Sequence, residues 1–457
     1  MTLRLAYRRL TRTGYAWFPK LPEHWRLSRL KHVSSINDET LPEGTGNDHE
    51  IEYVDIGGVT RNVGITRIET LLFGDAPSRA RRLVRHGDVI VSTVRTYLKA
   101  ITKIENPPAN LVVSTGFAVV RPEAELDADF LGRALASEEF VGSVIANSDG
   151  VNYPAITSSR LGDLSLPVPP LREQRTIAAF LDHETARIDR LIEKQQRLIK
   201  LLEEKRQAVI SHAVTKGLDP DAPMKDSGVE WLGHVPAHWA IIRTGLLFRE
   251  VSEQGGADLP ILSVSIHHGV SSAEMSDEEL SRKVARSEDR TKYKRVRPND
   301  LTFNMMRAWQ GAFGAVRNLG QVSPAYIVAR PISSAIEPRF YEKQIRTPAG
   351  AEEVRRYSRG ITDFRLRLYW DEFKEIRCAV PPLAEQREIL EFLDSQEEQI
   401  TNLAAKLREA IGLLREHRAA LISAAVTGQI DVRDWQPTVE EAEAPLLQAA
   451  EEPATYG

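Results

Sequence analysis

The sequence contains one long stretch twice. Residues 169–219 read PPLREQRTIAAFLDHETARIDRLIEKQQRLIKLLEEKRQAVISHAVTKGLD, and residues 381–431 read PPLAEQREILEFLDSQEEQITNLAAKLREAIGLLREHRAALISAAVTGQID. The two copies align without a gap, and 25 of the 51 positions are identical. An ungapped repeat of this length predicts that the two halves of the chain share one architecture.

Each copy carries apolar residues at helical spacing. Steps of three, four and seven residues place them on one stripe of a helix, which we expect from about Glu184 to Thr215 in the first copy. Such a stripe needs a partner, and a pseudo-two-fold axis would let the two copies pair antiparallel with equivalent surroundings. We therefore predict a coiled coil of two long helices that pair through Ile188, Leu191, Leu198, Leu202, Val209, Ile400, Leu403, Leu407, Ile411, Leu414 and Leu421.

Composition limits the class of protein. The single cysteine, Cys378, excludes an internal disulfide and a cysteine-based zinc site. The N-terminus has arginines where a signal peptide carries its apolar core, and no run of 18 apolar residues occurs. We therefore expect a cytoplasmic protein with no membrane association. A net charge of −4 argues against indiscriminate binding to nucleic acid, although local clusters matter more than the sum.

The repeat extends beyond the helices. The pattern Gly-x-x-Trp followed by Pro and His-Trp occurs in residues 14–25 and again in 228–239. Strand-like apolar runs also recur, in residues 87–97 and 299–309 and in 114–122 and 323–331. Short helices are expected in 128–146 and 338–357. The predicted fold class is α+β with mixed strands and helices: two globules of about 150 residues, separated by the two long helices in an internal pseudo-two-fold repeat.

These patterns divide the chain into seven segments. They are a basic N-terminal segment (1–20), a first globule (21–168), a central repeated helical region (169–217), a turn-rich linker (218–230), a second globule (231–380), a distal repeated helical region (381–431) and an acidic tail (432–457). The last twenty residues are rich in glutamate and carry no basic residue, so we expect them to be disordered.

Basic residues gather in both globules. A solvated surface and contact with phosphate are both open interpretations of such clusters, and their presence in both globules favours phosphate contact. The residues are Arg79, Arg81, Arg82 and Arg85 in the first globule and Arg282, Lys283, Arg286, Arg290, Lys292, Lys294, Arg295 and Arg297 in the second.

Arg95 and Arg307 occupy one repeated position, each two residues before an aromatic side chain. Either residue could contact a base or phosphate, or could form a salt bridge inside the fold. Lys99 and Tyr153 are further candidate DNA contacts of the first globule.

Motifs for catalysis are missing. Asn106-Pro-Pro-Ala resembles the adenine-methyltransferase motif, but Ala109 replaces the aromatic residue that stacks on the flipped base, and no glycine-rich turn precedes it. No P-loop occurs, and Glu203-Glu204-Lys205 is more simply a solvated face of a helix. The histidine pairs lack further ligands at useful spacing, so we expect no metal site.

Two features of the chain carry a family resemblance: the Pro-Pro-Leu-x-Glu-Gln-Arg block that occurs twice beside two diverged globules, and the linker Met-Lys-Asp-Ser-Gly-Val-Glu-Trp-Leu-Gly at 224–233. In both features the chain resembles the specificity (S) subunits of type I restriction-modification systems, the HsdS family. The resemblance covers nearly the whole chain. It implies two target recognition domains, each reading one half of a bipartite asymmetric DNA sequence, and helices that set the spacer between the halves.

The resemblance also implies partners. Double-stranded DNA, two adenine-methylating M subunits and, in some systems, two restriction subunits are expected. The chain itself is expected to be non-catalytic and to bind no cofactor, with S-adenosylmethionine and Mg-ATP on the partner subunits.

One loop departs from the repeat. The first copy has Gly-Val-Asn-Tyr-Pro at 150–154, and the corresponding residues of the second copy are Gly-Ile-Thr-Asp-Phe at 360–364. The contacts of that loop therefore need not be alike in the two globules.

The alternative function is a double-headed protein scaffold that never touches nucleic acid, and the negative net charge is its main support.

Overall fold

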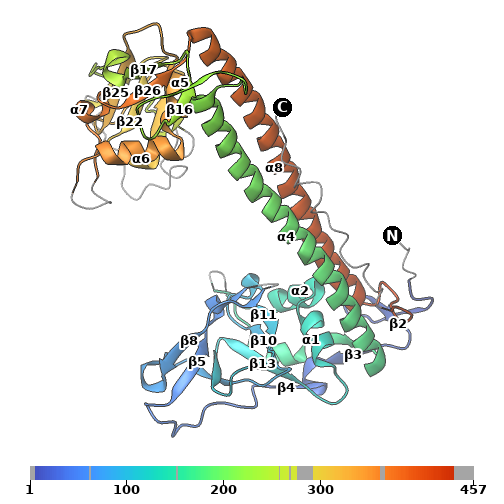
Figure 1. The fold of residues 1–457 in the computed structure, drawn as a ribbon. Coiled ribbons are helices and arrows are strands. Elements are labelled where there is room, and N and C mark those ends of the chain that lie inside the picture. The colour runs from blue at the N-terminus through green and yellow to red at the C-terminus, as the bar shows by residue number, and fades with distance from the viewer. Residues whose placement is uncertain are drawn as a thin grey trace. The chain divides into compact units, whose positions relative to one another are not determined.

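The computed structural model describes residues 6–60, 63–150, 153–256, 258–266, 269–274, 292–360 and 366–436 (Figure 1). These residues fall into two compact units, one of 6–195 with 408–436 and the other of 196–407. Each unit holds one globular head, the first part of one long helix and the last part of the other. The mixed helix and strand composition and the two-headed repeat confirm the predicted fold class.

The long helices are α4 (Leu171–Lys216) and α8 (Leu383–Val426). Helix α4 begins thirteen residues before the start that its apolar stripe predicted, directly after Pro170. The stripe predicted too late a start because it reflects pairing with the other long helix. The apolar residues of the first turns, Ile177, Phe180 and Leu181, are buried against the first head instead. The equivalent first turns of α8 bury Ile389, Leu390 and Leu393 in the second head.

The two helices run antiparallel. In the first unit Arg418 Nε of α8 lies 3.0 Å from Asp189 Oδ1 of α4. In the second unit Arg206 Nη2 of α4 lies 3.1 Å from Glu397 Oε1 of α8. Within this second unit Ala213 and Val214 of α4 share a core with Ile389 of α8, so residue numbers rise along one helix as they fall along the other, as predicted.

The seam follows a seven-residue pattern. Ile188 and Ile192 of α4 and Ile400, Ala404 and Ile411 of α8 are buried, in steps of four and seven. This spacing is typical of coiled-coil packing. Of the other predicted pairing residues, five are half-buried along the same line, namely Leu202, Val209, Leu407, Leu414 and Leu421.

Three predicted pairing residues lie beside the seam and not in it. Leu191, Leu198 and Leu403 are 44%, 49% and 47% exposed. Each directly precedes a seam position in its helix, so the stripe read from the sequence was one residue too wide on this side.

The first head is built on two four-stranded sheets. Their strand orders are β11-β10-β13-β4 and β8-β5-β12-β9, and β5 with β12 is the parallel pair. The strands are β4 (Ser34–Ile36), β5 (Glu50–Val54), β8 (Glu69–Leu72), β9 (Ala80–Leu83), β10 (Val89–Ser92), β11 (Ile101–Lys103), β12 (Leu111–Ser114) and β13 (Phe117–Pro122). Strands β10 and β13 are the strands expected in residues 87–97 and 114–122.

Helices cover one face of the β10 sheet and the second sheet covers the other. Val89 and Val91 of β10 pack with Phe130 of α1, whereas the alternate residue Ile90 packs with Val113 of the second sheet. Strand β10 is therefore apolar on both faces, since successive side chains point to opposite sides. The helices are α1 (Ala128–Leu135), α2 (Glu138–Ala146) and α3 (Ser158–Asp163), and small pairs are β1 (Leu10–Arg12) with β2 (Lys20–Pro22), β3 (Arg26–Arg29) with β14 (Ser165–Val168), and β6 (Val59–Thr60) with β7 (Gly64–Ile65).

The second head repeats this arrangement. Its main sheet has the order β18-β25-β22-β23, from β18 (Phe248–Glu250), β25 (Tyr326–Pro331), β22 (Leu301–Asn304) and β23 (Phe313–Ala315). Helices α5 (Pro338–Ile345), α6 (Pro348–Tyr357) and α7 (Trp370–Phe373) accompany it. The smaller pairs are β15 (Met224–Asp226) with β16 (His234–Pro236), β17 (Ala240–Arg243) with β26 (Arg377–Val380), β19 (Val264–Ser265) with β20 (Gly269–Val270), and β21 (Lys294–Val296) with β24 (Gly320–Val322).

Two segment interpretations change in detail. Part of the expected linker, Met224–Asp226, is strand β15, and part of the expected N-terminal segment, Leu10–Arg12, is strand β1. At the other end of the chain, Val432 and Trp435 pack into the first unit. The residues expected to be disordered lie outside the described residues.

Candidate nucleic-acid interface

The repeated glutamate of the Pro-Pro-Leu-x-Glu-Gln-Arg block fastens each head to a long helix. Glu173 accepts hydrogen bonds from Trp25 Nε1 at 3.1 Å and lies 2.8 Å from His24 Nε2. In the second unit Glu385 makes the same contacts, at 2.9 Å to Trp239 Nε1 and 2.7 Å to the ring of His238. The repeated His-Trp pair and the repeated glutamate therefore belong to one structural joint.

The repeated glutamine bonds to the backbone. Gln174 Nε2 donates to Pro169 O at 2.8 Å, and its Oε1 accepts from Asp127 N at the start of α1 at 2.8 Å. Gln386 makes the equivalent bonds in the second unit, to Pro381 O and from Glu337 N, both at 2.8 Å. These buried bonds satisfy backbone groups where a helix meets a head. The repeated Glu-Gln pair of this motif thus has a structural role in both units.

Two of the four arginines in the predicted cluster of the first head pair with acids of the same head. Arg79 Nη2 lies 2.8 Å from Asp55 Oδ2, and Arg85 Nε donates to Glu39 Oε2 at 3.0 Å. Burial raises the pKa of Asp55, but the hydrogen bonds and charge of Arg79 outweigh burial and hold it below its usual value. Arg81 lies over the ring of Phe73, 4.6 Å from its centroid.

Arg82 differs from its neighbours. Its Nε is buried and has no hydrogen-bond partner among the described residues, and burial lowers the pKa of its guanidinium. This cluster thus serves mainly the fold of its own head.

A second arginine network recurs in both heads. Arg121 binds Asp88 at 2.8 Å and Glu39 at 3.0 Å, and these bonds raise its pKa. Arg330 binds Asp300 at 2.8 Å and also pairs with Glu253. Because Asp88 and Asp300 are almost fully buried, the networks hold the two heads in one shape.

Basic residues of the second head are placed in a similar way. Lys294 Nζ donates to Tyr326 O at 2.8 Å, and Arg297 Nη2 lies 2.8 Å from Glu253 Oε2. Arg295 Nε is buried without a partner among the described residues, while Lys292 is exposed. Arg282 and Lys283, with Arg286 and Arg290, lie outside the described residues.

Arg95, Lys99 and Tyr153 come together on the surface of the first head. The Arg95 guanidinium lies over the ring of Tyr153, 5.0 Å from its centroid. Between Arg95 and Lys99 runs the short helix η4 (Thr96–Leu98), and it carries Tyr97 and Leu98. Tyr97, Leu98 and Tyr153 are 51%, 46% and 66% exposed. We call Arg95, Tyr97, Leu98, Lys99 and Tyr153 the Arg95 cluster.

The Arg95 cluster has the composition of a nucleic-acid contact. Cations neutralise phosphate, and exposed aromatic rings stack on bases. Arg95 forms no ion pair with a carboxylate of the described residues, so its charge is available to a ligand. Tyr97 and Leu98 are members that sequence analysis did not list, although Tyr97 was noted as the aromatic neighbour of Arg95.

The equivalent turn of the second head is built differently. Helix η7 (Ala308–Gln310) follows Arg307, and Trp309 takes the place of Tyr97. Trp309 is half-buried, and Met306 is the exposed apolar residue of this turn. The loop that would match Tyr153 falls within 361–365, outside the described residues. The two heads thus share a frame and differ at this surface.

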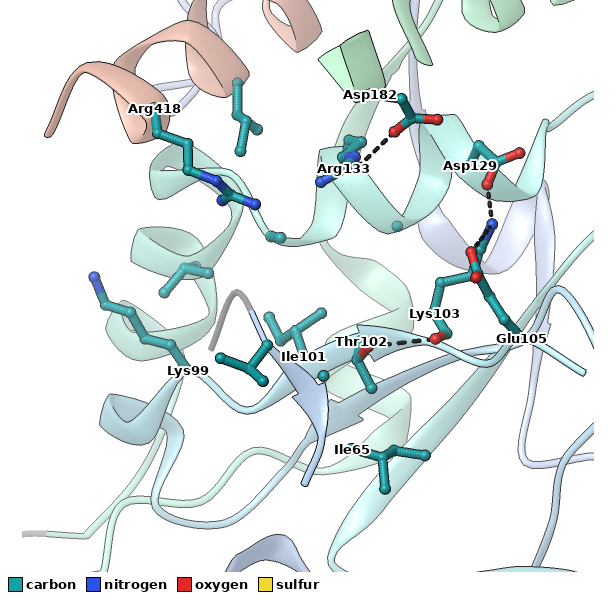
Figure 2. Close-up of a pocket in the computed structure, with 16 residues that line it drawn as sticks. Ile65, Lys99, Ile101, Thr102, Lys103, Glu105, Asp129, Arg133, Asp182 and Arg418 are labelled. Atoms are coloured by element: carbon teal, nitrogen blue, oxygen red, sulfur yellow. Dashed lines mark hydrogen bonds and ion pairs between the residues drawn. The ribbon is translucent and has the colours of Figure 1, made fainter. Parts of the chain in front are cut away.

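A cavity of about 400 Å³ adjoins the cluster in the first unit, and Figure 2 shows its lining. Its cations are paired with acids: Lys103 lies 2.7 Å from Glu105, and Arg133 lies 2.5 Å from Asp182. Lys99 and Arg418 are likewise paired, at 2.8 Å to Glu138 and 3.0 Å to Asp189. The paired charges leave no net attraction for an anionic ligand in this cavity.

The described part of the chain contains neither a candidate metal site nor a helix that could cross a membrane. No group of three or more His, Cys, Asp or Glu residues there is arranged to hold a metal ion. None of the described helices has the length and apolar character to cross a membrane.

The chain is similar to DNA specificity proteins in sequence and in fold. Residues 22–202 match the family described as type I restriction modification DNA specificity domain. The chain is 28% identical over 295 residues to the EcoBI specificity subunit of Escherichia coli, covering 59% of this chain and 60% of the relative. It is 23% identical over 314 residues to the EcoKI specificity subunit of Escherichia coli strain K12, covering 63% and 64%.

These alignments span less than two thirds of either relative. Solved structures extend the likeness of fold to most of the chain. A protein from a study of complex assembly and conformational transition in the type I R-M system matches with a TM-score of 0.67 at 23% identity, over 90% of this chain and 99% of that one. The HsdS subunit of Thermoanaerobacter tengcongensis matches with a TM-score of 0.52 at 23% identity, over 90% and 98%. These matches confirm the resemblance of the chain to the HsdS family of type I restriction-modification specificity subunits.

Proposed function

We propose that this chain is the DNA sequence-specificity subunit of a type I restriction-modification complex. In this proposal each head reads one half of a bipartite asymmetric target. One observation carries it: the heads share the Trp–Glu joint and the Arg–Asp–Glu network but differ at the surface turn after β10 and β22. A common frame with different exposed side chains suits two readers of two different half-sites, because base contacts specify the sequence.

The Arg95 cluster is the proposed contact surface of the first head. The exposed rings support this role, as does the Arg95 guanidinium, which forms no ion pair with a carboxylate of the described residues. In the second head, Arg307 with exposed Met306 and Lys292 is the corresponding candidate surface. The paired residues Arg79, Arg85 and Lys294 become positioning residues of the heads, since their charges are already compensated or bound.

The long helices are proposed to set the gap between half-sites and to dock two methyltransferase (M) subunits. The exposed leucines beside the seam support docking, since Leu198, Leu201 and Leu403 leave apolar surface in the second unit uncovered. Adenine methylation would then occur on the M subunits with S-adenosylmethionine. Any DNA cleavage would occur on restriction subunits with Mg-ATP, and this chain would supply specificity alone.

The test is DNA binding by the chain in complex with its M subunits. Arg95→Ala should weaken binding to the target by about tenfold, the order expected for one desolvated cationic or stacking contact. The matched control is Arg9→Ala, which removes an exposed arginine of the same unit. Equal affinities for the two variants would contradict the proposed surface. Failure of the intact complex to bind any duplex at low salt would favour the protein-scaffold alternative.

A further inference from the structure

The backbone on both sides of η4 is strained. Among the described residues, five that are not glycine have positive φ, and three of these are asparagine, which tolerates this conformation. The other two are Arg95 and Lys99, both with φ of 52°, and they flank η4 on either side. A left-handed conformation is unfavourable for such residues, because it brings Cβ close to the following carbonyl oxygen. Strain of this kind is typical of functional sites, where the surrounding structure holds it in place.

The base of the turn is held from several directions. Thr96 is buried, and its hydroxyl lies 3.1 Å from Ser148 Oγ. Lys99 Nζ donates to Glu138 Oε2 at 2.8 Å, so both ends of the turn are tied to the region of α2. Backbone bonds from Leu98 N to Arg95 O and from Lys99 N to Thr96 O close it. The tip therefore has a fixed shape before any ligand binds.

The held turn presents apolar side chains between cations. Tyr97 and Leu98 are adjacent and exposed, whereas the neighbouring Thr96 is buried. Arg95 and Lys99 flank the pair, and the Arg95 guanidinium has only the ring of Tyr153 among its described contacts. Because Lys99 is already paired with Glu138, Arg95 is the cation beside this apolar tip. An apolar tip next to a cation is complementary to an anionic partner that offers an apolar interior, as duplex DNA does between its stacked bases.

We propose that Leu98, supported by Tyr97, acts as a wedge that enters one base step of the half-site read by the first head. This inference rests on the proposed function. Proteins that insert apolar side chains between base pairs partly unstack the step and kink the duplex. The cost of unstacking depends on the step, so the wedge would add specificity at a position without hydrogen-bond readout. Pre-set geometry of the turn lowers the entropy lost on insertion.

The second head lacks this device in the same form. At the position of Lys99 it has Gly311, whose φ of 89° carries no strain for glycine. Trp309, the counterpart of Tyr97, is half-buried. The wedge therefore belongs to one half-site, and the complex should unstack the duplex in that half alone.

The experiment uses the full chain with its M subunits and duplexes that carry its target, identified by methylation-sensitive sequencing. Fluorescent 2-aminopurine is placed in turn at each position of both half-sites. The wild-type complex should raise the fluorescence at one step of one half-site. Leu98→Ala should abolish most of that rise and weaken binding by roughly tenfold, with an unchanged melting temperature. The control is Leu72→Ala, a 47% exposed leucine on β8 of the same head, which should change neither signal.

Other outcomes separate the wedge from the proposed function. Target-specific binding with no rise at any position would overturn the wedge and leave the proposed function standing. Loss of M-subunit binding by Leu98→Ala, with the fluorescence rise intact in the residual complex, would make the turn a protein contact and overturn the wedge. Absence of sequence preference in the intact complex would overturn the proposed function and the wedge together.

Discussion

Trp25 donates its indole N–H to Glu173 at 3.1 Å, and this bond has an equivalent in the other half of the chain, from Trp239 to Glu385 at 2.9 Å. In both units the tryptophan belongs to a head and the glutamate to the first turn of a long helix. The bond thus couples the position of each head to the direction of a helix. Its repetition explains why Glu-Gln-Arg and His-Trp survive in both copies while the heads diverge.

Loss of this bond should destabilise the second unit. Trp239→Phe removes the donor of a hydrogen bond to the half-buried carboxylate of Glu385, and it should lower the free energy of unfolding by about 2 kcal/mol, the order of a hydrogen bond to a charged group. The control is Trp309→Phe in the same unit, because the Trp309 Nε1 has no partner among the described residues. Urea denaturation measures both changes, and an equal loss in the two variants would contradict the role of the bond.

The antiparallel seam predicts a charge-reversal rescue. Arg418 is almost fully buried beside Asp189, so Asp189→Arg should destabilise the first unit by about 2 kcal/mol. The double variant Asp189→Arg with Arg418→Asp should recover most of this loss in thermal denaturation. As a control, reversal of the exposed pair Lys200 and Glu204, four residues apart within α4, should change little. A double variant no more stable than the single one would mean that the two side chains do not meet.

The stability of the second unit should depend on pH through Glu397. Burial raises the pKa of this carboxyl, but Lys343 and Arg206 outweigh burial and hold it below its usual value near 4.5. A lowered folded-state pKa stabilises the fold above the unfolded-state pKa, and this stabilisation is lost as pH falls through the folded-state value. Glu397→Gln should therefore be less stable than wild type at pH 7, and the difference should shrink as the pH falls below 4.5. Glu398→Gln, a change at the next and exposed position, should show no such convergence.

Strain at Lys99 should reverse the usual order of glycine and alanine. Because Lys99 has a φ of 52°, Lys99→Gly should be more stable than Lys99→Ala by about 1 kcal/mol. At Glu204, an exposed position inside α4, glycine should instead be less stable than alanine by a similar amount. Chemical denaturation of the four variants decides the matter, and the same order at both positions would show that Lys99 is unstrained.

Much of the architecture could be predicted from the sequence, because the repeat and the apolar period are local signals. Strands β10 and β13, the short helices of the heads and the antiparallel pairing all follow from them. The start of α4 could not be predicted, since Ile177 and Phe180 pack on a head and not on a helix. These two residues have helical spacing, but they do not lie on the seam between the two long helices from which the helix was predicted.

The candidate site was harder to predict because its contacts are distant in sequence. Arg79 meets Asp55, which lies 24 residues away, and Arg85 meets Glu39 at a separation of 46. Sequence analysis detects a cluster of arginines but not the acids that compensate them. Arg95 and Tyr153 were both candidates, yet nothing local indicated that one lies over the other. Positive φ at Arg95 and Lys99 has no sequence signal, since neither residue is glycine or asparagine.

The proposal that the long helices set the gap between the half-sites can be tested by lengthening both helices. Insertion of four residues after Gln195, and of four after the approximately opposite Ala410, lengthens the coiled coil by about 6 Å and turns it by a net of about 40°. One base pair turns DNA by roughly 34 to 36°, so the rotational match favours one added base pair between half-sites. Methylation of targets with gaps varied in single steps measures the preference. A folded insertion variant that binds M subunits and keeps the original gap would show that the helices do not set it.

The most direct test of independent half-site reading is an exchange of one head. Residues 21–160 are replaced by the corresponding head of a relative with a different target, and the chimera is expressed with its M subunits. Methylation-sensitive sequencing of the host genome then reads the new target. We predict that one half of the bipartite sequence changes while the other half and the gap remain the same. A target in which both halves change together, or in which neither changes, would contradict the account.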